Sequence, residues 1–245
     1  MIVIPAIDII DGQCVRLYKG DYDKKTVYGS DPIEAALKWQ SEGASWVHII
    51  DLDGAKKGAP VNLKIVSNIK KSTGLKIEYG GGIRDSNSAG KCIEAGVDKI
   101  ILGTAALKDF EFFSRVYIES DGKAIISLDS SESGRILTEG WTKSIEISLA
   151  DFALRLRKTG CNEAIITDVS RDGTLEGINI KKIKDFLAKT GLGIFVAGGV
   201  TNIEDILKLK EIENMGVKGV IIGKALYENT IDLQAALQAS GEKLN

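Results

Sequence analysis

The chain has 245 residues, of which 44% are hydrophobic and 27% are charged, and its 32 Lys and Arg residues nearly balance its 34 Asp and Glu residues. This profile is ordinary for a globular protein and argues against disorder, collagen and coiled coil. The balance of charge also argues against a dedicated nucleic-acid binder, which is usually basic. The 27 glycines against 3 prolines are unusual and suggest many tight strand-to-helix turns.

The apolar stretches and the numbers of Cys and His residues argue against several kinds of site. No apolar stretch approaches the roughly 20 residues of a spanning helix, so we expect a cytoplasmic protein with no membrane partner. The cysteines Cys14, Cys92 and Cys161 are far apart and form no CxxC pair, which indicates neither a disulfide framework nor a zinc ribbon. His48 is the only histidine, so we expect no His-rich metal site. Its apolar strand favours a core or outward-facing residue over a catalyst.

In chain order, short and nearly continuous apolar runs alternate with helical patterns. The runs predict strands at residues 2–7, 46–51, 76–79, 99–102, 123–129, 163–167, 194–197 and 219–222. Asp31 and Pro32 are expected to open one helix, and Thr201 with Glu204 another as a capping box. The alternation predicts a (β/α)8 barrel forming a single domain over residues 1–245, with a doubly wound open sheet as the alternative.

The two halves of the chain resemble each other, which weakens the open-sheet alternative. Gly80–Ile83 corresponds to Ala197–Val200, and residues 96–105 correspond to residues 216–225. Residues 49–54 correspond to residues 165–169, which aligns Asp51 with Thr167. We therefore predict two half-barrels, approximately residues 1–120 and 121–245. The competing interpretation is that any two βαβ stretches look alike.

Glycine turns follow four of the predicted strands, where a barrel carries its active site. Glycine lets backbone N–H groups approach an anion closely, and a following helix N-terminus adds positive charge. The paired turns therefore predict two phosphate sites and a substrate with a phosphate at each end; the alternative is that the glycines only permit tight turns. The residues concerned are Gly81, Gly82, Gly103, Thr104, Gly198, Gly199, Gly223 and Lys224.

Carboxylates lie at the same ends of the strands. Asp8 and Asp129 end the first and fifth predicted strands, on opposite sides of an eight-stranded barrel, and could serve as general base and general acid. Thr167 ends the sixth strand, and Asp172 lies in the loop that follows it. The alternative role of a strand-end Asp is to cap a helix, but no helix is expected after Asp8 until about Asp31.

Several further side chains could hold a substrate. Arg16, Lys19 and Arg84 could contact anions, although surface solvation is the alternative. That alternative is weakest for Arg84, which directly follows the Gly80–Ile83 turn. Trp141 could stack on a flat ring or could instead plug a hairpin.

The motifs taken together resemble those of the ProFAR isomerase (HisA) family of histidine biosynthesis, along essentially the whole chain. The matching segments are Pro5–Leu17, Ile50–Ala55, Gly80–Arg84, Gly140–Trp141, Thr167–Thr174 and Ala197–Val200. The resemblance implies a (β/α)8 barrel built from two half-barrels. It also implies a bis-phosphorylated ribotide, phosphoribosylformimino-5-aminoimidazole carboxamide ribotide (ProFAR), as the substrate.

The resemblance implies an Amadori rearrangement, in which an aldose aminal becomes an aminoketose without a metal or redox cofactor. Asp8 is then the expected general base. Asp129 is the usual general acid, with Asp172 as a rival, and Thr167 supports the reacting sugar. Arg84 and Trp141 match positions that hold the substrate. A monomer with no obligate protein partner and no nucleic acid is expected.

Three alternatives remain open at this stage. The related cyclase subunit of imidazole glycerol phosphate synthase shares the barrel but typically has a Cys-Leu-Asp first strand, where this chain has Ala6-Ile7-Asp8. A bifunctional relative also isomerises phosphoribosylanthranilate for tryptophan synthesis. A non-catalytic phosphate-binding barrel is disfavoured, because it would have no use for several carboxylates near two anions.

Overall fold

The structure is a computed structural model that describes residues 1–18 and 20–242, so Lys19 lies outside the described residues. The strands of the barrel are β1 (Ile2–Ile10), β4 (Trp46–Asp51), β5 (Lys76–Gly80), β6 (Lys99–Leu102), β7 (Ala124–Ser130), β10 (Glu163–Asp168), β11 (Gly193–Ala197) and β12 (Val217–Ile222). The strands outside the barrel are β2 (Gln13–Tyr18), β3 (Asp21–Gly29), β8 (Arg135–Thr138) and β9 (Lys143–Ser148).

Helices occupy the connections between the barrel strands. In the first part of the chain they are α1 (Pro32–Ser41), α2 (Leu52–Lys57), α3 (Leu63–Ser72), α4 (Ser86–Glu94), α5 (Thr104–Lys108) and α6 (Phe110–Glu119). Later come α7 (Leu149–Arg157), α8 (Ile180–Thr190), α9 (Ile203–Glu211), the short 3₁₀ helix η1 (Glu213–Met215), α10 (Lys224–Tyr227) and α11 (Leu233–Ser240). Within the described residues, no helix is both long and apolar enough to cross a membrane.

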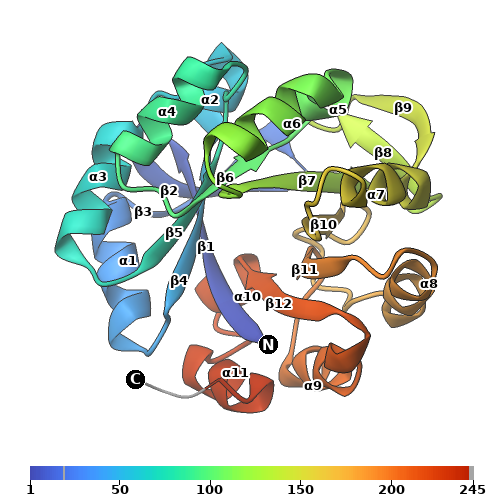
Figure 1. Ribbon diagram of the computed structural model, residues 1–245. Coiled ribbons are helices and arrows are strands. Elements are labelled where there is room, and N and C mark those ends of the chain that lie inside the picture. Colours follow the sequence, from blue (N-terminus) through green and yellow to red (C-terminus); the bar gives the residue numbers. More distant parts are fainter. Residues whose placement is uncertain (19, 243–245) are drawn as a thin grey trace. The chain divides into compact units, whose positions relative to one another are not determined.

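The barrel strands follow the order β10-β11-β12-β1-β4-β5-β6-β7, and β7 also pairs with β10. This pairing closes an eight-stranded parallel barrel with helices around it (Figure 1). The predicted (β/α)8 fold is therefore confirmed, and the open-sheet alternative is wrong. All eight predicted strands are present, most of them one or more residues longer than predicted.

The chain divides into two compact units. The amino-terminal unit comprises Ile4–Arg16 and Lys25–Ile126, and the carboxy-terminal unit comprises Met1–Val3, Leu17–Lys24 and Ser127–Asn245. The change of unit between Ile126 and Ser127 lies close to the predicted boundary between the half-barrels. The single-domain organisation stays a prediction.

In the amino-terminal unit, the register of the parallel strands β1, β4 and β5 places rows of side chains on the face of the sheet that bears Asp8. Ala6 pairs with His48 and Asp8 with Ile50, while β5 continues the two rows with Glu78 and Gly80. The opposite face of β4 and β5 packs fully buried residues such as Ile49 and Tyr79. Asp31 caps α1 as predicted, accepting a hydrogen bond from the Ile33 N–H.

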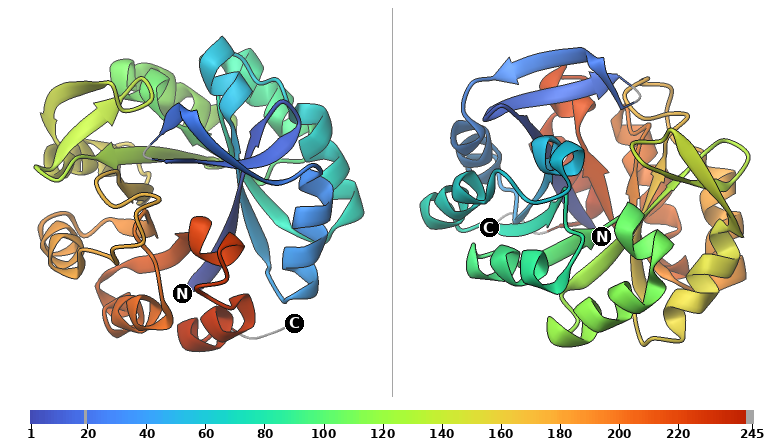
Figure 2. Two further views of the ribbon diagram at one scale, coloured as in Figure 1. Left: turned by 180° about the vertical axis from the view of Figure 1, so that it is seen from behind. Right: turned by 90° about the horizontal axis from the view of Figure 1, so that it is seen from above.

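In the carboxy-terminal unit, an antiparallel ribbon of β8 and β9 follows β7 and contacts α7, and Figures 1 and 2 show it in yellow-green. Helix α9 begins one residue later than predicted. Asn202 is its N-cap and accepts a 3.1 Å hydrogen bond from Asp205 N–H. The Thr201 hydroxyl instead donates to the Gly199 carbonyl, so it is engaged in the preceding turn.

The structural equivalence of the two halves differs by one residue from the predicted alignment of Asp51 with Thr167. Ile49 pairs with Tyr79 just before the glycine turn of the first half, and Ile166 pairs with Val196 in the second. Asp168 is therefore the counterpart of Asp51, and the predicted alignment is wrong. Since strand side chains alternate between faces, a slip of one residue moves a side chain to the other face.

Candidate active site

Asp8 lies near the C-terminal end of β1 and forms an ion pair with Arg16. The β1–β2 hairpin places Asp8 opposite Val15, so Arg16 follows on the neighbouring strand. The Arg16 Nη1 atom lies 2.8 Å from Asp8 Oδ2, and the two side chains are 13% and 14% exposed. The first helix begins only at Pro32, so Asp8 caps no helix. A partly exposed carboxylate at this position can accept a proton.

Asp51, at the end of β4, has a different role. It is fully buried and accepts five hydrogen bonds, at 2.7–2.8 Å. The donors are the backbone N–H groups of Gly54, Val61 and Asn62, the Asn62 side-chain amide and the Tyr79 hydroxyl. A buried carboxylate so fully satisfied organises the loop after β4 and has no oxygen left for a substrate.

The positions after β5 and β11 require glycine for steric reasons. At Gly81, where φ is 125°, an added Cβ atom would lie 2.2 Å from the Asp51 carbonyl oxygen. At Gly198, where φ is 82°, the added atom would lie 2.7 Å from the Asp168 carbonyl oxygen. The following glycines, Gly82 and Gly199, meet backbone oxygens in the same way. Close packing against the previous loop therefore requires these glycines, whether or not an anion binds there.

The turns after β6 and β12 differ in that each leads into a helix without a side-chain cap. Gly103 and Gly223 are the N-cap residues of α5 and α10, and neither helix has a side-chain cap. An added Cβ atom at Gly103 would meet nothing within 4 Å. The helices begin with Thr104 and Lys224. Uncapped N–H groups at a helix start are suited to binding an anion.

Asp129 lies near the end of β7 and is held by neutral donors. Its Oδ2 atom accepts a 2.8 Å hydrogen bond from the Trp141 indole N–H, and its Oδ1 atom accepts one of 3.0 Å from the Ser127 hydroxyl. The Trp141 ring lies against the backbone of Gly20, where an added Cβ atom would come within 2.7 Å of the ring. Trp141 is thus fixed by its own unit.

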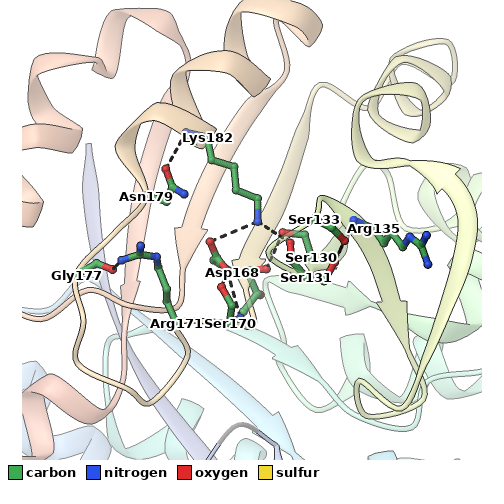
Figure 3. A network of polar contacts seen from close by, with 11 residues as sticks. Ser130, Ser131, Ser133, Arg135, Asp168, Ser170, Arg171, Gly177, Asn179 and Lys182 are labelled. Atoms are coloured by element: carbon green, nitrogen blue, oxygen red, sulfur yellow. Dashed lines mark hydrogen bonds and ion pairs between the residues drawn. The ribbon is translucent and has the colours of Figure 1, made fainter.

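Asp168 forms the centre of the polar network in Figure 3. It accepts a 2.6 Å hydrogen bond from the Ser170 hydroxyl and lies 3.4 Å from the Lys182 ammonium group. Lys182, on α8, also donates a 2.8 Å hydrogen bond to the Ser131 carbonyl. Sequence reasoning missed this lysine. The signal available was its position three residues after Asn179, which caps α8.

The loop between β10 and α8 carries further predicted residues. Thr167, partly buried, pairs with Ala197 of β11. Asp172 is partly buried in the loop, and the Lys224 ammonium group donates a 3.0 Å hydrogen bond to the neighbouring Gly173 carbonyl. The structure thus brings the start of α10 to the Asp172 loop within the carboxy-terminal unit.

Arg84 is exposed and lies over α2. Its guanidinium group would be 2.6 Å from a Cβ atom added at Gly58, and its Nη2 atom lies 3.5 Å from the Ala55 carbonyl oxygen. Part of the side chain thus packs on the end of a helix, while its charge stays accessible to an anion.

His48 is buried, as the sequence indicated, but it lies on the Asp8 face of the sheet. Its Nδ1 atom is 2.5 Å from the Glu78 Oε1 atom, and Glu78 is fully buried. Among the described residues, no group of three or more His, Cys, Asp or Glu side chains is arranged to hold a metal ion.

Comparison with known proteins gives consistent results. A family model described as "Histidine biosynthesis protein" matches residues 2–232. A protein of Synechocystis sp. is 40% identical, over 98% of this chain and 94% of its own length. Proteins of Pelotomaculum thermopropionicum and Syntrophomonas wolfei are 41% and 42% identical, over 99% of this chain and 94% and 100% of their own lengths. All three are named 1-(5-phosphoribosyl)-5-((5-phosphoribosylamino)methylideneamino) imidazole-4-carboxamide isomerase, which is ProFAR isomerase.

Proposed function

The chain belongs to the histidine biosynthesis protein family, and we propose that it is the isomerase that rearranges ProFAR to its aminoketose, PRFAR. Relatives with this activity in their names match nearly the full chain, so the isomerase is favoured over the alternatives. The first strand carries Ala6-Ile7-Asp8, and Arg16 follows on β2, which does not suit the cyclase pattern. The substrate is a bis-phosphorylated ribotide.

The environment of Asp8 carries the assignment of the general base. The other strand-end carboxylate of its unit, Asp51, is saturated, and Asp53 accepts hydrogen bonds from Asp11 N–H and the Asn62 amide. Asp8 instead has one charged partner and an accessible edge. We assign to it the removal of the C2′ proton of the sugar after ring opening, and the return of a proton to C1′.

Ring opening requires a general acid, and two carboxylates of the carboxy-terminal unit compete for this role. Asp129 already accepts two hydrogen bonds, and the Trp141 indole N–H can only donate. Asp172 lies in a loop tied to α10 through Lys224 and Gly173. Thr167 supports the sugar by hydrogen bonding in either case.

The open helix starts support the proposal that two phosphates bind. We place one at Gly103 and Thr104 and the other at Gly223 and Lys224, because uncapped N–H groups favour an anion. Gly81, Gly82, Gly198 and Gly199 border these sites in the proposal but are also required sterically. Arg84 and Trp141 are proposed to contact the substrate, and neither a metal nor a redox cofactor is assigned a step.

The proposal also covers the domain organisation, oligomeric state and location of the protein. We propose a single-domain monomer that acts in the cytoplasm, with no obligate protein partner, nucleic acid or membrane contact. The near-balance of 32 basic and 34 acidic residues supports local rather than global anion binding.

Purified protein tests the function directly. With ProFAR as substrate, we expect PRFAR to form equally fast with and without ammonia. In a parallel assay with PRFAR as substrate, imidazole glycerol phosphate formed only with ammonia would indicate the cyclase. Turnover of phosphoribosylanthranilate would indicate the bifunctional relative. No turnover of either substrate by folded protein would contradict the proposal.

The same assay separates the two candidate acids. Asp129→Asn and Asp172→Asn keep the shape of each side chain but remove its acidic proton. The acid should lose about 100-fold or more in kcat, and the other residue much less. Equal and small losses in both variants would contradict the assignment of the acid to this pair.

A further inference from the structure

Lys182, the lysine of the network in Figure 3, has no role in the mechanism so far. Its ammonium group donates a 2.8 Å hydrogen bond to the Ser131 carbonyl after β7 and lies 3.4 Å from the Asp168 Oδ2 atom at the end of β10. The side chains of Lys182 and Asp168 are 22% and 15% exposed. One side chain of α8 therefore joins the ends of two strands that are neighbours in the barrel.

On the β7 side, Lys182 holds the turn that follows Asp129. Ser131 lies two residues after Asp129, and its carbonyl also accepts a 3.0 Å hydrogen bond from the Gly134 N–H. This turn leads into β8 and then to Trp141, whose indole N–H donates to Asp129. The lysine thus fixes the start of the segment that returns to the Asp129 carboxylate.

On the β10 side, Lys182 holds the turn that precedes Asp172. The Asp168 Oδ1 atom accepts hydrogen bonds from the Ser170 N–H at 3.2 Å and from the Ser170 hydroxyl at 2.6 Å. The Asp168 carbonyl accepts one of 3.1 Å from the Arg171 N–H. These bonds fold the chain just before Asp172, while Lys182 holds the other carboxylate oxygen of Asp168. The two segments that present the two candidate acids therefore share one ammonium group.

The equivalent position in the first half carries an apolar residue. Lys182 is the third residue of α8, after the N-cap Asn179, and Ile65 is the third residue of α3, after the N-cap Asn62. The Ile65 Cδ1 atom would lie 3.9 Å from a Cβ atom added at Gly12, so Ile65 also faces the turn after the first strand of its half. Isoleucine can pack there but cannot donate a hydrogen bond. At this position, a hydrogen-bonding side chain occurs in the half that carries both candidate acids.

Building on the proposed function, we propose that Lys182 is a positioning residue for the general acid. Its ammonium group, which has three N–H donors and no acceptor, holds the turn after β7 and the turn after β10 together. Asp129 and Asp172 then keep fixed positions relative to each other and to the sugar. A displacement of about 1 Å in a reacting group can cost about 100-fold in rate, so the lysine acts on kcat through these carboxylates.

Substitutions on α8 test this role. Lys182→Met keeps the apolar stem and removes the ammonium group, so it should lower kcat about 10-fold with little change in KM. Lys182→Arg restores a positively charged donor and should recover most of that loss. The matched control is Lys181→Met, which removes a charge from the neighbouring position, where the lysine pairs with Asp185 at the surface. This control should leave kcat unchanged.

A double variant shows whether the lysine acts through the acid. The background is Asp129→Asn or Asp172→Asn, whichever loses more kcat. Adding Lys182→Met to it should lower kcat by less than about 2-fold, because the group that the lysine positions is already gone. A further loss of about 10-fold, as large as in the wild-type background, would show that Lys182 acts independently of the acid and would overturn the proposal.

Hydrogen exchange tests the link without any turnover. In free Lys182→Met protein, residues 131–135 and 168–172 should both exchange faster than in wild type, whereas residues 10–13 of the first half should be unchanged. If Lys182→Met does not fold, Lys182→Gln, which is too short to reach both loops, should give the same pattern.

Faster exchange in only one of the two segments, or in neither, would overturn the proposal, and so would faster exchange in both with a wild-type kcat. If wild-type protein does not turn over ProFAR, the proposed function fails, whereas the exchange still reports on the link between the two turns.

Discussion

The two halves of the barrel use equivalent aspartates differently. In the amino-terminal unit, Asp51 is fully buried and accepts five hydrogen bonds, one of them from the Tyr79 hydroxyl. In the carboxy-terminal unit, its counterpart Asp168 is partly exposed and relies on Ser170 and Lys182. The position of Tyr79 is taken by Val196, which has no hydroxyl to donate.

This substitution leaves space in the second half. A cavity of about 30 Å³ lies beside Asp168, Lys182 and Val196, and its remaining walls are mainly apolar. Polar groups at its edge and its size would suit a water molecule. Asp51 thus supports the loop after β4 rigidly, whereas Asp168 supports the loop after β10 less tightly. The loop after β10 carries Asp172, a candidate acid that a substrate must reach.

Removing each aspartate should show the largest difference between the two halves. Asp51→Ala leaves three backbone N–H groups and the Tyr79 hydroxyl without an acceptor, so we expect a loss of about 3–5 kcal/mol in the free energy of unfolding. Asp168→Ala should cost about 1–2 kcal/mol, because its partners are nearer to solvent. Denaturant titration of both variants measures the difference, and equal losses would show that the two positions are energetically alike.

Alkaline pH should sharpen the comparison, because Asp51 lies near buried acids, Cys92 and Tyr79, whose pKa values are raised, whereas Asp168 lies beside Lys182. Burial and the Asp51 charge raise the pKa of the Cys92 thiol from 9.0 to about 12, and burial, with the Asp51 hydrogen bond, also raises the pKa of Tyr79. In the second half, the position equivalent to Cys92 is occupied by Leu209, which cannot ionise. Each is the seventh residue of its helix, Cys92 in α4 and Leu209 in α9.

These groups stay protonated in the folded state and ionise in the unfolded state. The contribution of these two groups to the unfolding free energy should therefore be constant below about pH 9 and fall as pH rises from about 9 toward 12. Cys92→Ala should reduce this fall by up to about 1.4 kcal/mol per pH unit. Urea titrations at several pH values measure the slope, and a slope that is the same in variant and wild type would contradict the account.

Filling the cavity should have the smallest effect. Val196→Ile adds one methylene group to the space that the Tyr79 ring occupies in the other half, and should stabilise the protein by about 0.5–1 kcal/mol. Ile194→Val, on the same wall, should enlarge the cavity and destabilise by about 1 kcal/mol. A lower thermal midpoint for Val196→Ile than for wild type would mean that the space is already well packed.

The sequence predicted the barrel because buried parallel strands are continuous apolar runs, and all eight were found. It aligned Asp51 with Thr167 because similarity of letters does not reveal which face a strand residue occupies. The register with Tyr79 and Val196 was needed to correct that alignment.

The chemistry of the site was only partly predictable for the same reason. Asp8 was identified because no helix follows it, a local feature of the chain. His48 was interpreted as a core residue, since its partner Glu78 lies on another strand. The steric need for Gly81 and Gly198 also depends on loops brought together by folding. Local patterns therefore predicted the elements, whereas pairing across strands decided the roles.

The most direct test of the account is the turnover of ProFAR by Asp8→Asn. The change keeps the shape of the side chain and removes the base, and the Asn amide oxygen can still accept a hydrogen bond from Arg16. We predict a loss of about 1,000-fold or more in kcat, no C2′ exchange in D₂O and a thermal midpoint close to wild type. A folded Asp8→Asn protein with near-normal kcat would contradict the account.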